Sequence, residues 1–289
     1  MTAEGLVGAD DVRVTPEWLA LREPADAAAR SIELAARAAR HLPTTGPLVI
    51  HDLGGGEGAM ARWLAPRLPG PQHWVIHDRD VDLLELAVAD RPGPAPGPGP
   101  WAGRAADGTA VTVEARRGDI TRLEPDDLAG ASLVVASALL DMLTAEELPA
   151  MLEACIATGA PVLLALSVVG RVALTPAEPL DAVVAAAFDA HQRRTTAAGR
   201  LLGPDAVAAA AGHLRASGAE VLVRPSPWRL DARHAALAAA WLDGWVAAAC
   251  EQEPSLVADA VAYRDRRRAR AAAGRLAVTV HHADLLALP

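Results

Sequence analysis

Residues 48–58, Leu-Val-Ile-His-Asp-Leu-Gly-Gly-Gly-Glu-Gly, lead an apolar strand directly into a glycine-rich turn. The segment that follows, 59–68, is expected to form a helix. Glycine accepts backbone conformations that are closed to other residues and lets a ligand lie against the main chain. A helix N-terminus behind such a turn presents backbone N–H groups to a polar ligand. The pattern therefore predicts a nucleotide-type cofactor site at the end of a buried strand.

Two cofactor classes compete for this turn. Gly54, Gly56 and Ala59 have the spacing G-x-G-x-x-A of a dinucleotide site, which would make the protein an NAD(P)-dependent oxidoreductase. Asp52 argues against that class, because a carboxylate would repel the pyrophosphate that arrives at the first glycine. An acid two residues before that glycine suits a ligand with a cationic end instead.

The turn resembles the D-x-G-x-G-x-G motif of class I S-adenosylmethionine (SAM)-dependent methyltransferases. SAM carries an ammonium and a sulfonium, so an acid in the turn is electrostatically reasonable. The resemblance implies that SAM is the cofactor and S-adenosylhomocysteine (SAH) the product. The cofactor-binding residues that it implies here are Asp52, Leu53, Gly54, Gly56 and Gly58.

Acids at the ends of the next two strands extend the resemblance. A strand over 73–77 ends at Asp78, about two dozen residues past the first glycine, where an acid can accept both ribose hydroxyls. Its neighbour Arg79 is included in the predicted cofactor site. The acid Asp78 does not discriminate between cofactors, because it would fit the ribose of NAD equally well. After the third strand, the resemblance implies that Asp119 accepts the adenine amino group and that Ile120 packs on the ring.

A fourth strand over 132–136 leads into Ser137 and the segment Ser-Ala-Leu-Leu-Asp-Met-Leu. The resemblance places this segment on the methyl-transfer face, with Ser137 at the cofactor. Asp141 lies just beyond the strand, at the sheet edge where ligands bind in such folds. We expect Asp141 to be catalytic; the alternative is a helix-cap or loop acid near Thr144.

Strands and helices alternate from residue 47 to 167, which predicts a parallel sheet with helices on both faces. The expected fold is α/β, a doubly wound and mostly parallel seven-stranded sheet. We expect a helical lid segment over 1–45 and a SAM-binding core over 46–289, with helical insertions at about 171–217 and 232–273. The second insertion is a departure, because the last two strands of the family usually form a hairpin.

The remaining elements follow from periodicity and from capping signals. Thr144 and Glu147 form a capping box, and Gly159 is expected to close the helix that follows. Further strands are expected over 111–116, 161–166, 220–224 and 276–281. Helices are expected over 18–41 with Pro24 near the start, 179–191, 205–217, 232–250 and 255–273.

The N-terminal helix carries a row of charged residues. Arg22, Asp26 and Arg30 recur every four residues and share a helix face. In some members of the family an N-terminal helix closes over the SAM carboxylate, so Arg22 is included in the cofactor site and Trp18 in the substrate site. For Asp26 and Arg30 a surface ladder of charges is the preferred interpretation.

Methyl transfer is an in-line displacement, so the enzyme mainly aligns the nucleophile and excludes water. A base is needed only for a protonated nucleophile. His191 is the second catalytic candidate, because the pKa of histidine lies near neutrality. Arg193, Arg194 and Arg200 could hold a substrate carboxylate or phosphate. The alternative for this segment is a solvated loop.

Charge and composition argue for a small-molecule substrate. The net charge of −9 disfavours a polyanionic partner. The arginine run 264–270, around Tyr263, is interpreted as a solvated helix face, because all 27 basic residues are Arg and the residue type is not distinctive. An RNA (rRNA or tRNA) methyltransferase is the first alternative function, and a non-catalytic SAM-binding protein is the second.

Other signals concern compartment and partners. Cys155 and Cys250 are isolated, so we expect neither a disulfide framework nor a zinc site, and no other metal motif is present. No signal peptide or membrane-spanning run is visible, which predicts a cytoplasmic protein without a membrane partner. Residues 92–103 read as a Pro/Gly surface loop that Trp101 could anchor. The oligomeric state is left open.

Overall fold

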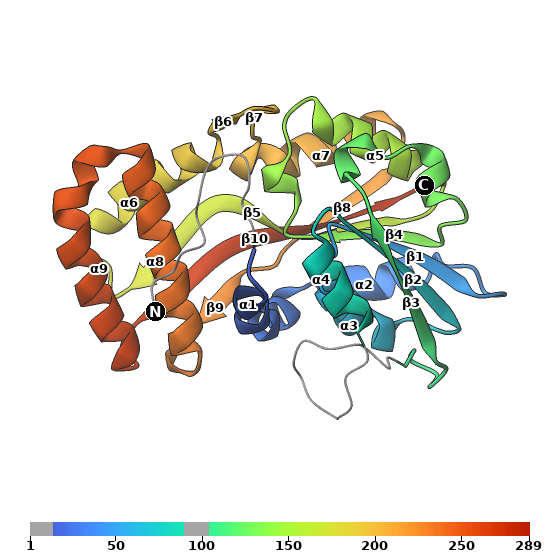
Figure 1. Cartoon of the computed structure of the whole chain (residues 1–289), viewed down its shortest axis with the longest axis horizontal. Helices are drawn as coiled ribbons and strands as arrows, with labels where there is room; N and C mark the ends of the chain where they lie inside the picture. Colours follow the sequence, from blue (N-terminus) through green and yellow to red (C-terminus); the bar gives the residue numbers. More distant parts are fainter. Residues whose placement is uncertain (1–13, 90–103) are drawn as a thin grey trace.

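The computed structural model describes residues 14–89 and 104–289 (Figure 1). The predicted Pro/Gly loop over 92–103, with Trp101, lies outside the described residues. Seven strands form the central sheet in the order β3-β2-β1-β4-β5-β10-β8, and β9 pairs with β10. The first five strands are parallel, whereas β10 is antiparallel to each of its neighbours. The doubly wound, mostly parallel sheet is therefore confirmed.

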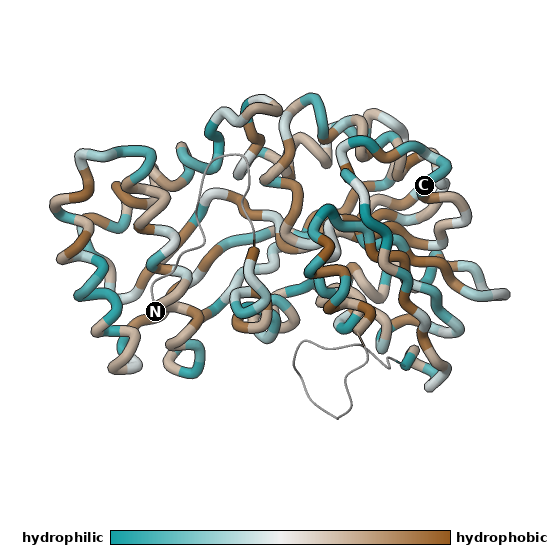
Figure 2. Tube along the Cα trace, in the orientation of Figure 1, coloured by the Kyte–Doolittle hydropathy of each residue, from teal (hydrophilic) through white to brown (hydrophobic). Residues whose placement is uncertain are grey.

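Except for β5 and β10, the predicted strands agree closely with the observed ones. Their bounds are Leu48–Leu53 for β1, Gln72–Asp78 for β2, Val111–Arg117 for β3, Leu133–Ser137 for β4, Val162–Thr175 for β5, Glu220–Pro225 for β8, Trp228–Leu230 for β9 and Ala277–Leu288 for β10. Figure 2 shows hydrophobic residues running along the strands at the centre of the sheet, as expected for strands covered on both faces.

Helices cover both faces of the sheet. On one face lie α2 (Ile32–Ala39) and α3 (Ala59–Leu64), and α4 (Val81–Val88) packs beside them on β2 and β3. The other face is covered by α5 (Glu147–Ala157) and α7 (Ala206–Ala216). The predicted capping box is present, since Thr144 Oγ1 accepts from Glu147 N at 3.1 Å and Glu147 Oε2 accepts from Thr144 N at 2.9 Å.

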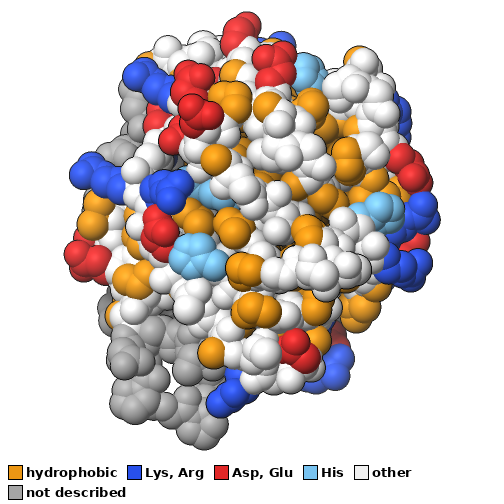
Figure 3. All heavy atoms as spheres, turned by 90° about the vertical axis from the view of Figure 1, so that its right-hand side faces the viewer, with side chains coloured by type: hydrophobic (Ala, Val, Ile, Leu, Met, Phe, Trp, Pro, Cys, Tyr) orange, Lys and Arg blue, Asp and Glu red, His pale blue; other side chains and the backbone are white. Residues whose placement is uncertain are grey.

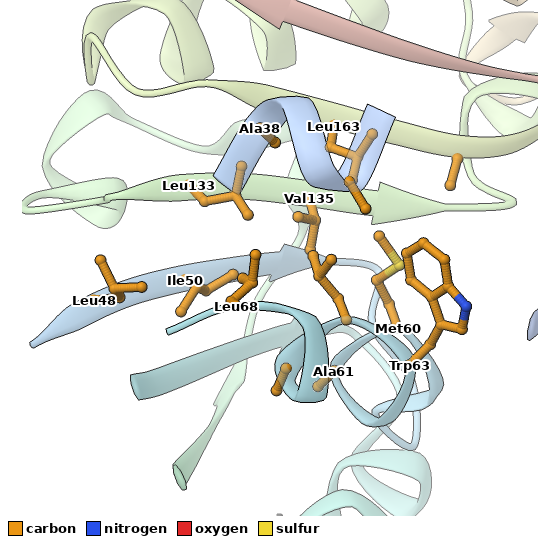
Figure 4. Close-up of a cluster of buried hydrophobic side chains, with 14 of the residues drawn as sticks. Ala38, Leu48, Ile50, Met60, Ala61, Trp63, Leu68, Leu133, Val135 and Leu163 are labelled. Atoms are coloured by element: carbon orange, nitrogen blue, oxygen red, sulfur yellow. The ribbon is translucent and has the colours of Figure 1, made fainter. Parts of the chain in front are cut away.

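The first hydrophobic core lies between the central strands and the helices α2 and α3, and its apolar row on β1 ends at Asp52. Leu48 and Ile50 of β1 lie beside Leu133 of β4 and face α2 and α3, as Figure 4 shows. Side chains on a strand alternate between the two faces, so Asp52 continues the same row. The row therefore passes from apolar side chains to a carboxylate at the carboxyl end of the strand.

The long strands β5 and β10 carry a second core. Both extend far beyond the predicted ranges 161–166 and 276–281, so those bounds were wrong. Residues 171–175, placed in the first insertion, belong to β5. Each strand is stabilised by the other through an antiparallel ladder, and such pairing between distant segments is not visible in local periodicity. The helices α6 (Leu180–Gln192), α8 (Ala235–Gln252) and α9 (Val257–Ala272) pack on these extensions.

Two short elements were not predicted. The polar stretch after α6 forms a hairpin of β6 (Thr195–Thr196) and β7 (Gly199–Arg200). Strand β9 adds a further edge to the start of β10. Both are too short to show a hydrophobic period of their own.

The N-terminal segment folds as two helices instead of one. Thr15 caps α1 (Pro16–Ala29), so Pro24 lies inside this helix and not near its start. The chain leaves the helix at Arg30, whose ψ is 140°, and Ser31 caps α2. Asp26 and Arg30 are buried, and the predicted surface charge ladder is therefore wrong for these two residues.

The basic run of α9 is also paired and not simply solvated. Arg267 is fully buried and donates to Asp181 and to the carbonyl oxygen of Pro176. Tyr263 donates to the same carboxylate at 2.6 Å. Ion pairs of its neighbours are Arg264–Asp265, Arg266–Glu178, Arg268–Asp243 and Arg270–Glu178. The run therefore anchors α9 to the second core.

We expect Arg267→Ala to lower the free energy of unfolding by about 3 kcal/mol, because it removes a fully buried side chain and leaves the half-buried carboxylate of Asp181 without its cation. Arg266→Ala is the matched control. Its side chain is 55% exposed, so the change should cost about 1 kcal/mol or less. Chemical denaturation of both variants measures the difference, and equal losses would contradict the structural role of Arg267.

Candidate active site

The strands β1, β2 and β4 end at one edge of the sheet, where the glycine turn joins them. Gly54, Gly56 and Gly58 have φ values of 63°, 52° and 82°, which only glycine adopts without strain. Asp52, Asp78 and Ser137 are the last or nearly last residues of these strands. The turn thus gathers backbone and carboxylates at the carboxyl edge, where ligands bind in such sheets.

Asp52 is a buried acid at this edge. Its side chain is fully buried, and neither carboxylate oxygen has a hydrogen-bond partner among the described residues. Burial raises the pKa of Asp52 to about 7, and the charge of Arg30 opposes this rise. An unpaired buried carboxylate is costly for stability, which marks the position as a candidate for binding a cation.

Arg30, which the sequence analysis assigned to a surface ladder of charges, is a buried cation whose charge acts on Asp52. Only 4% of the residue is exposed. Nη2 donates to Ser137 Oγ at 3.1 Å, whereas Nε and Nη1 have no hydrogen-bond partner in the part of the chain that the structure describes. Its guanidinium lies over the Trp63 ring, 5.6 Å from the centroid. Burial lowers the pKa of Arg30, and the charges of Asp26, Asp52 and Asp284 oppose that effect.

Gly55 is a second residue that the motif did not single out. A Cβ atom at this position would lie 2.7 Å from Asp52 Cγ and 2.8 Å from Ile76 Cγ2. The side chain of Asp52 therefore occupies the space that any other residue would need. The contact with Ile76 was not predictable from the sequence, because it joins the turn to the neighbouring strand β2.

The acids at the next two strand ends have different environments. Asp78 accepts from Gly56 N at 2.8 Å and from Asp80 N at 2.9 Å, so it fixes the glycine turn. Asp119 is exposed and accepts from Thr121. Arg79 is exposed, and Ile120 and Leu53 are half-buried and buried, respectively. Each of the predicted cofactor residues in strands β1 to β3 thus lies at or near this edge.

Helix α1 lies across the glycine turn. Arg62 of α3 donates to both carboxylate oxygens of Glu23 in α1, at 2.7 and 2.8 Å, and to the carbonyl oxygen of Glu57 at 2.5 Å. Leu19 of α1 is 3.9 Å from the Cβ position of Gly56. The helix is therefore fastened directly over the turn.

The predicted role of Arg22 is not reflected in its contacts. Its Nε donates to Asp26 at 2.9 Å, and its guanidinium stacks on Trp228, 5.2 Å from the ring centroid. Trp228 in turn donates to Asp26 at 2.8 Å. Trp18, predicted to contact substrate, packs against Trp228 with ring centroids 6.4 Å apart. These four side chains join α1 to β9.

Asp141 lies beside this cluster, in the short helical turn Leu140–Met142. Burial raises its pKa, and the positive charges of Arg22 and Arg194 oppose the rise. The backbone from 194 to 202 reaches the same turn, since Leu202 N donates to the carbonyl oxygen of Leu143 at 2.8 Å. Asp141, Arg22 and Arg194 are thus electrostatically coupled at the edge of β4.

The other predicted substrate residues have partners of their own. Arg193 pairs with Asp205 through two hydrogen bonds of 2.7 and 2.8 Å. Arg200 is exposed and donates to the carbonyl oxygen of Arg193. His191 is hydrogen-bonded to Glu251 of α8 at 3.1 Å, and burial lowers its pKa. These contacts hold the hairpin to its surroundings and do not bring the three side chains to Asp141.

Comparison with known proteins gives only structural likenesses. No protein-family model and no curated protein matches the sequence. The chain is similar to SAM-dependent methyltransferases from Geobacter sulfurreducens and Thiobacillus denitrificans, both solved with SAH. Each is 15% identical with a TM-score of 0.43; the first match covers 95% of this chain and 98% of that one, the second 94% and 98%. A cyclopropane synthase from Mycobacterium tuberculosis matches at 12% identity and a TM-score of 0.44, covering 88% of this chain and 82% of the other.

The strand order β3-β2-β1-β4-β5-β10-β8, with β10 antiparallel to its neighbours, identifies the fold. The chain has the class I methyltransferase fold. In this methyltransferase fold the insertion of α8 and α9 before the last strand is the departure that the sequence had indicated. Among the described residues, no helix is long and apolar enough to cross a membrane, and no cluster of metal-binding side chains occurs.

We expect Gly55→Ala to lower the melting temperature by several degrees, because the new Cβ displaces the side chain of Asp52 or Ile76. Gly118→Ala serves as the control, since its Cβ position has nothing within 4 Å and its φ is not in the left-handed region. Thermal denaturation of both variants, without ligand, tests the contact. A Gly55→Ala variant as stable as the control would refute the close packing of the turn.

Proposed function

We propose that the protein is a SAM-dependent methyltransferase that acts on a small molecule. The observation that carries the proposal is the burial of two electrostatically coupled groups, the carboxylate of Asp52 and the guanidinium of Arg30. Each has atoms that lack a protein partner among the described residues. The amino-acid end of SAM carries one ammonium and one carboxylate. A zwitterion of this kind would satisfy both buried charges at once.

The other residues of the edge fit the same ligand. Gly54 and Gly56 have no Cβ, so a ligand that lies across the turn can approach the main chain closely. We assign the ribose hydroxyls to Asp78 and the adenine amino group to Asp119, as the resemblance implies. The carboxylate of the cofactor goes to Arg30 and not to Arg22, because the guanidinium of Arg22 is already held by Asp26 and Trp228.

When bound, SAM supplies a methyl carbon that its positive sulfur makes electrophilic. The chain then has to orient the acceptor and exclude water. Helix α1, fastened over the glycine turn through Glu23 and Arg62, provides the cover. Asp141 would accept the proton of a hydroxyl or amine acceptor. Because its pKa is raised, the carboxylate of Asp141 is a stronger base than an ordinary aspartate.

A small acceptor is favoured over RNA because the arginines of α9 and Arg193 are already paired with carboxylates. The basic run on α9 forms ion pairs with Glu178, Asp181, Asp243 and Asp265. Arg193 pairs with Asp205. On the face drawn in Figure 3, acidic side chains lie among the basic ones. A polyanion would have to compete with these pairs, which lowers the electrostatic gain of binding.

The deciding experiment is calorimetric titration of the purified protein with SAH and, separately, with NADP. Micromolar binding of SAH without binding of NADP supports the proposal. Binding of NADP alone would overturn it and favour an oxidoreductase. Binding of neither ligand would contradict the fit of the amino-acid end to Asp52 and Arg30.

The affinity for SAH should depend on pH through Asp52. Its pKa of about 7 means that the carboxyl is protonated below this pH and cannot neutralise the ligand ammonium. Affinity should therefore fall by about tenfold per pH unit below 7 and level off above it. Asp52→Asn should weaken binding at pH 8 by about tenfold or more and flatten the profile. The exposed Asp126→Asn is the control, and an unchanged slope in Asp52→Asn would refute this role.

Asp141→Asn tests the base. With a hydroxyl acceptor found by screening phenols and alcohols, kcat should fall by about a hundredfold or more, while the affinity for SAH stays unchanged. His191→Gln is the comparison variant, and its kcat should be close to that of the parent. A larger loss in His191→Gln than in Asp141→Asn would reverse the assignment.

A further inference from the structure

A buried carboxylate on the last strand lies behind the proposed cofactor site. Asp284 of β10 is 1% exposed. Its Oδ2 accepts from Ser31 N at 2.6 Å, and its Oδ1 accepts from Leu166 N at 2.8 Å. Two backbone groups more than a hundred residues apart are thus fixed by one side chain.

Each of these backbone groups lies next to one end of the contact between Arg30 and Ser137. Ser31 directly follows Arg30, at the point where α1 ends and α2 begins. On the other side, Leu166 follows Ala165, whose carbonyl oxygen accepts from Ala138 N at 2.9 Å. Ala138 directly follows Ser137. Asp284 therefore holds the backbone beside the guanidinium and, through β5, the backbone beside its hydroxyl partner.

The backbone at these points is strained. Leu166 and Ala138 both have φ of 55°, in the left-handed region that residues with a side chain rarely adopt. Such conformations persist only where the surroundings impose them, and they cluster at functional sites. The hydrogen bond from Leu166 N to Asp284 is one such constraint, and it lies where the pairing of β5 with β10 shifts register.

We infer that Asp284 is a positioning residue for cofactor binding. It sets the break between α1 and α2 so that the guanidinium of Arg30 faces the carboxylate end of the cofactor. This role rests on the proposed function. Asp284 does not touch the ligand, so its effect is confined to the part of the cofactor that Arg30 binds.

Two ligands separate this role from a general structural one. SAH has the amino-acid end, whereas 5′-methylthioadenosine has the adenosine and the thioether without it. Asp284→Asn keeps the size of the side chain but turns an amide NH2 toward a backbone N–H. We expect Asp284→Asn and Arg30→Gln each to weaken SAH binding by about tenfold and to leave 5′-methylthioadenosine within about twofold. The double variant should bind SAH no more weakly than Arg30→Gln alone, because both changes remove one interaction.

A second pair of variants keeps the test independent of the folding of Asp284→Asn. Ser31→Pro removes the donor N–H at a position whose φ of −71° suits proline, and Ser31→Ala keeps that N–H. Both lose the hydroxyl that caps α2. Only Ser31→Pro should lose SAH affinity selectively.

The outcomes separate the two proposals. Equal loss of both ligands in Asp284→Asn, or unchanged SAH affinity, would overturn the positioning role while the parent protein still binds SAH. Full additivity with Arg30→Gln would overturn it as well. A parent protein that binds neither ligand would overturn the proposed function, and the positioning role with it.

Discussion

The structure depends on the burial of two opposite charges, Asp52 and Arg30, at the edge of the sheet. A carboxylate and a guanidinium removed from water without full partners destabilise a fold unless something repays the cost. Here the neighbouring segments hold them in place: the break between α1 and α2, the glycine turn and the last strand. The cost in folding stability and the proposed affinity for a zwitterion have the same origin, namely two buried charges with unpaired atoms. A site that binds such a ligand strongly is one that is poorly satisfied without it.

The antiparallel ladder of β5 and β10 links this edge to the second core. The two strands extend past the parallel sheet and carry α6, α8 and α9. Strand β9, paired with the same extension, presents Trp228 to Asp26 and Arg22 of α1. The helical insertion is therefore not a separate appendage, because it supports the surface on which α1 rests above the turn.

Much of the site was predictable because it is local. The glycine turn, the acids at the strand ends and the capping box each occupy one short segment whose residue types indicate the local structure. The burial of Arg30 and the contacts of Asp284 were not predictable, since both depend on segments that are distant in the sequence. Pro24 was misread for a related reason: the better start signal, Thr15-Pro16, lies eight residues earlier.

The sequence by itself determined the α/β class, the position of the glycine turn and the mostly parallel character of the sheet. These properties follow from hydrophobic period, glycine content and chain direction, which are encoded over a few residues at a time. Only the tertiary structure decided how far β5 and β10 extend, that Asp52 and Arg30 are both buried, and which of the predicted substrate residues lie near Asp141. Those properties depend on burial and on pairing between distant segments, because a charge acquires its function from the groups that remove it from water.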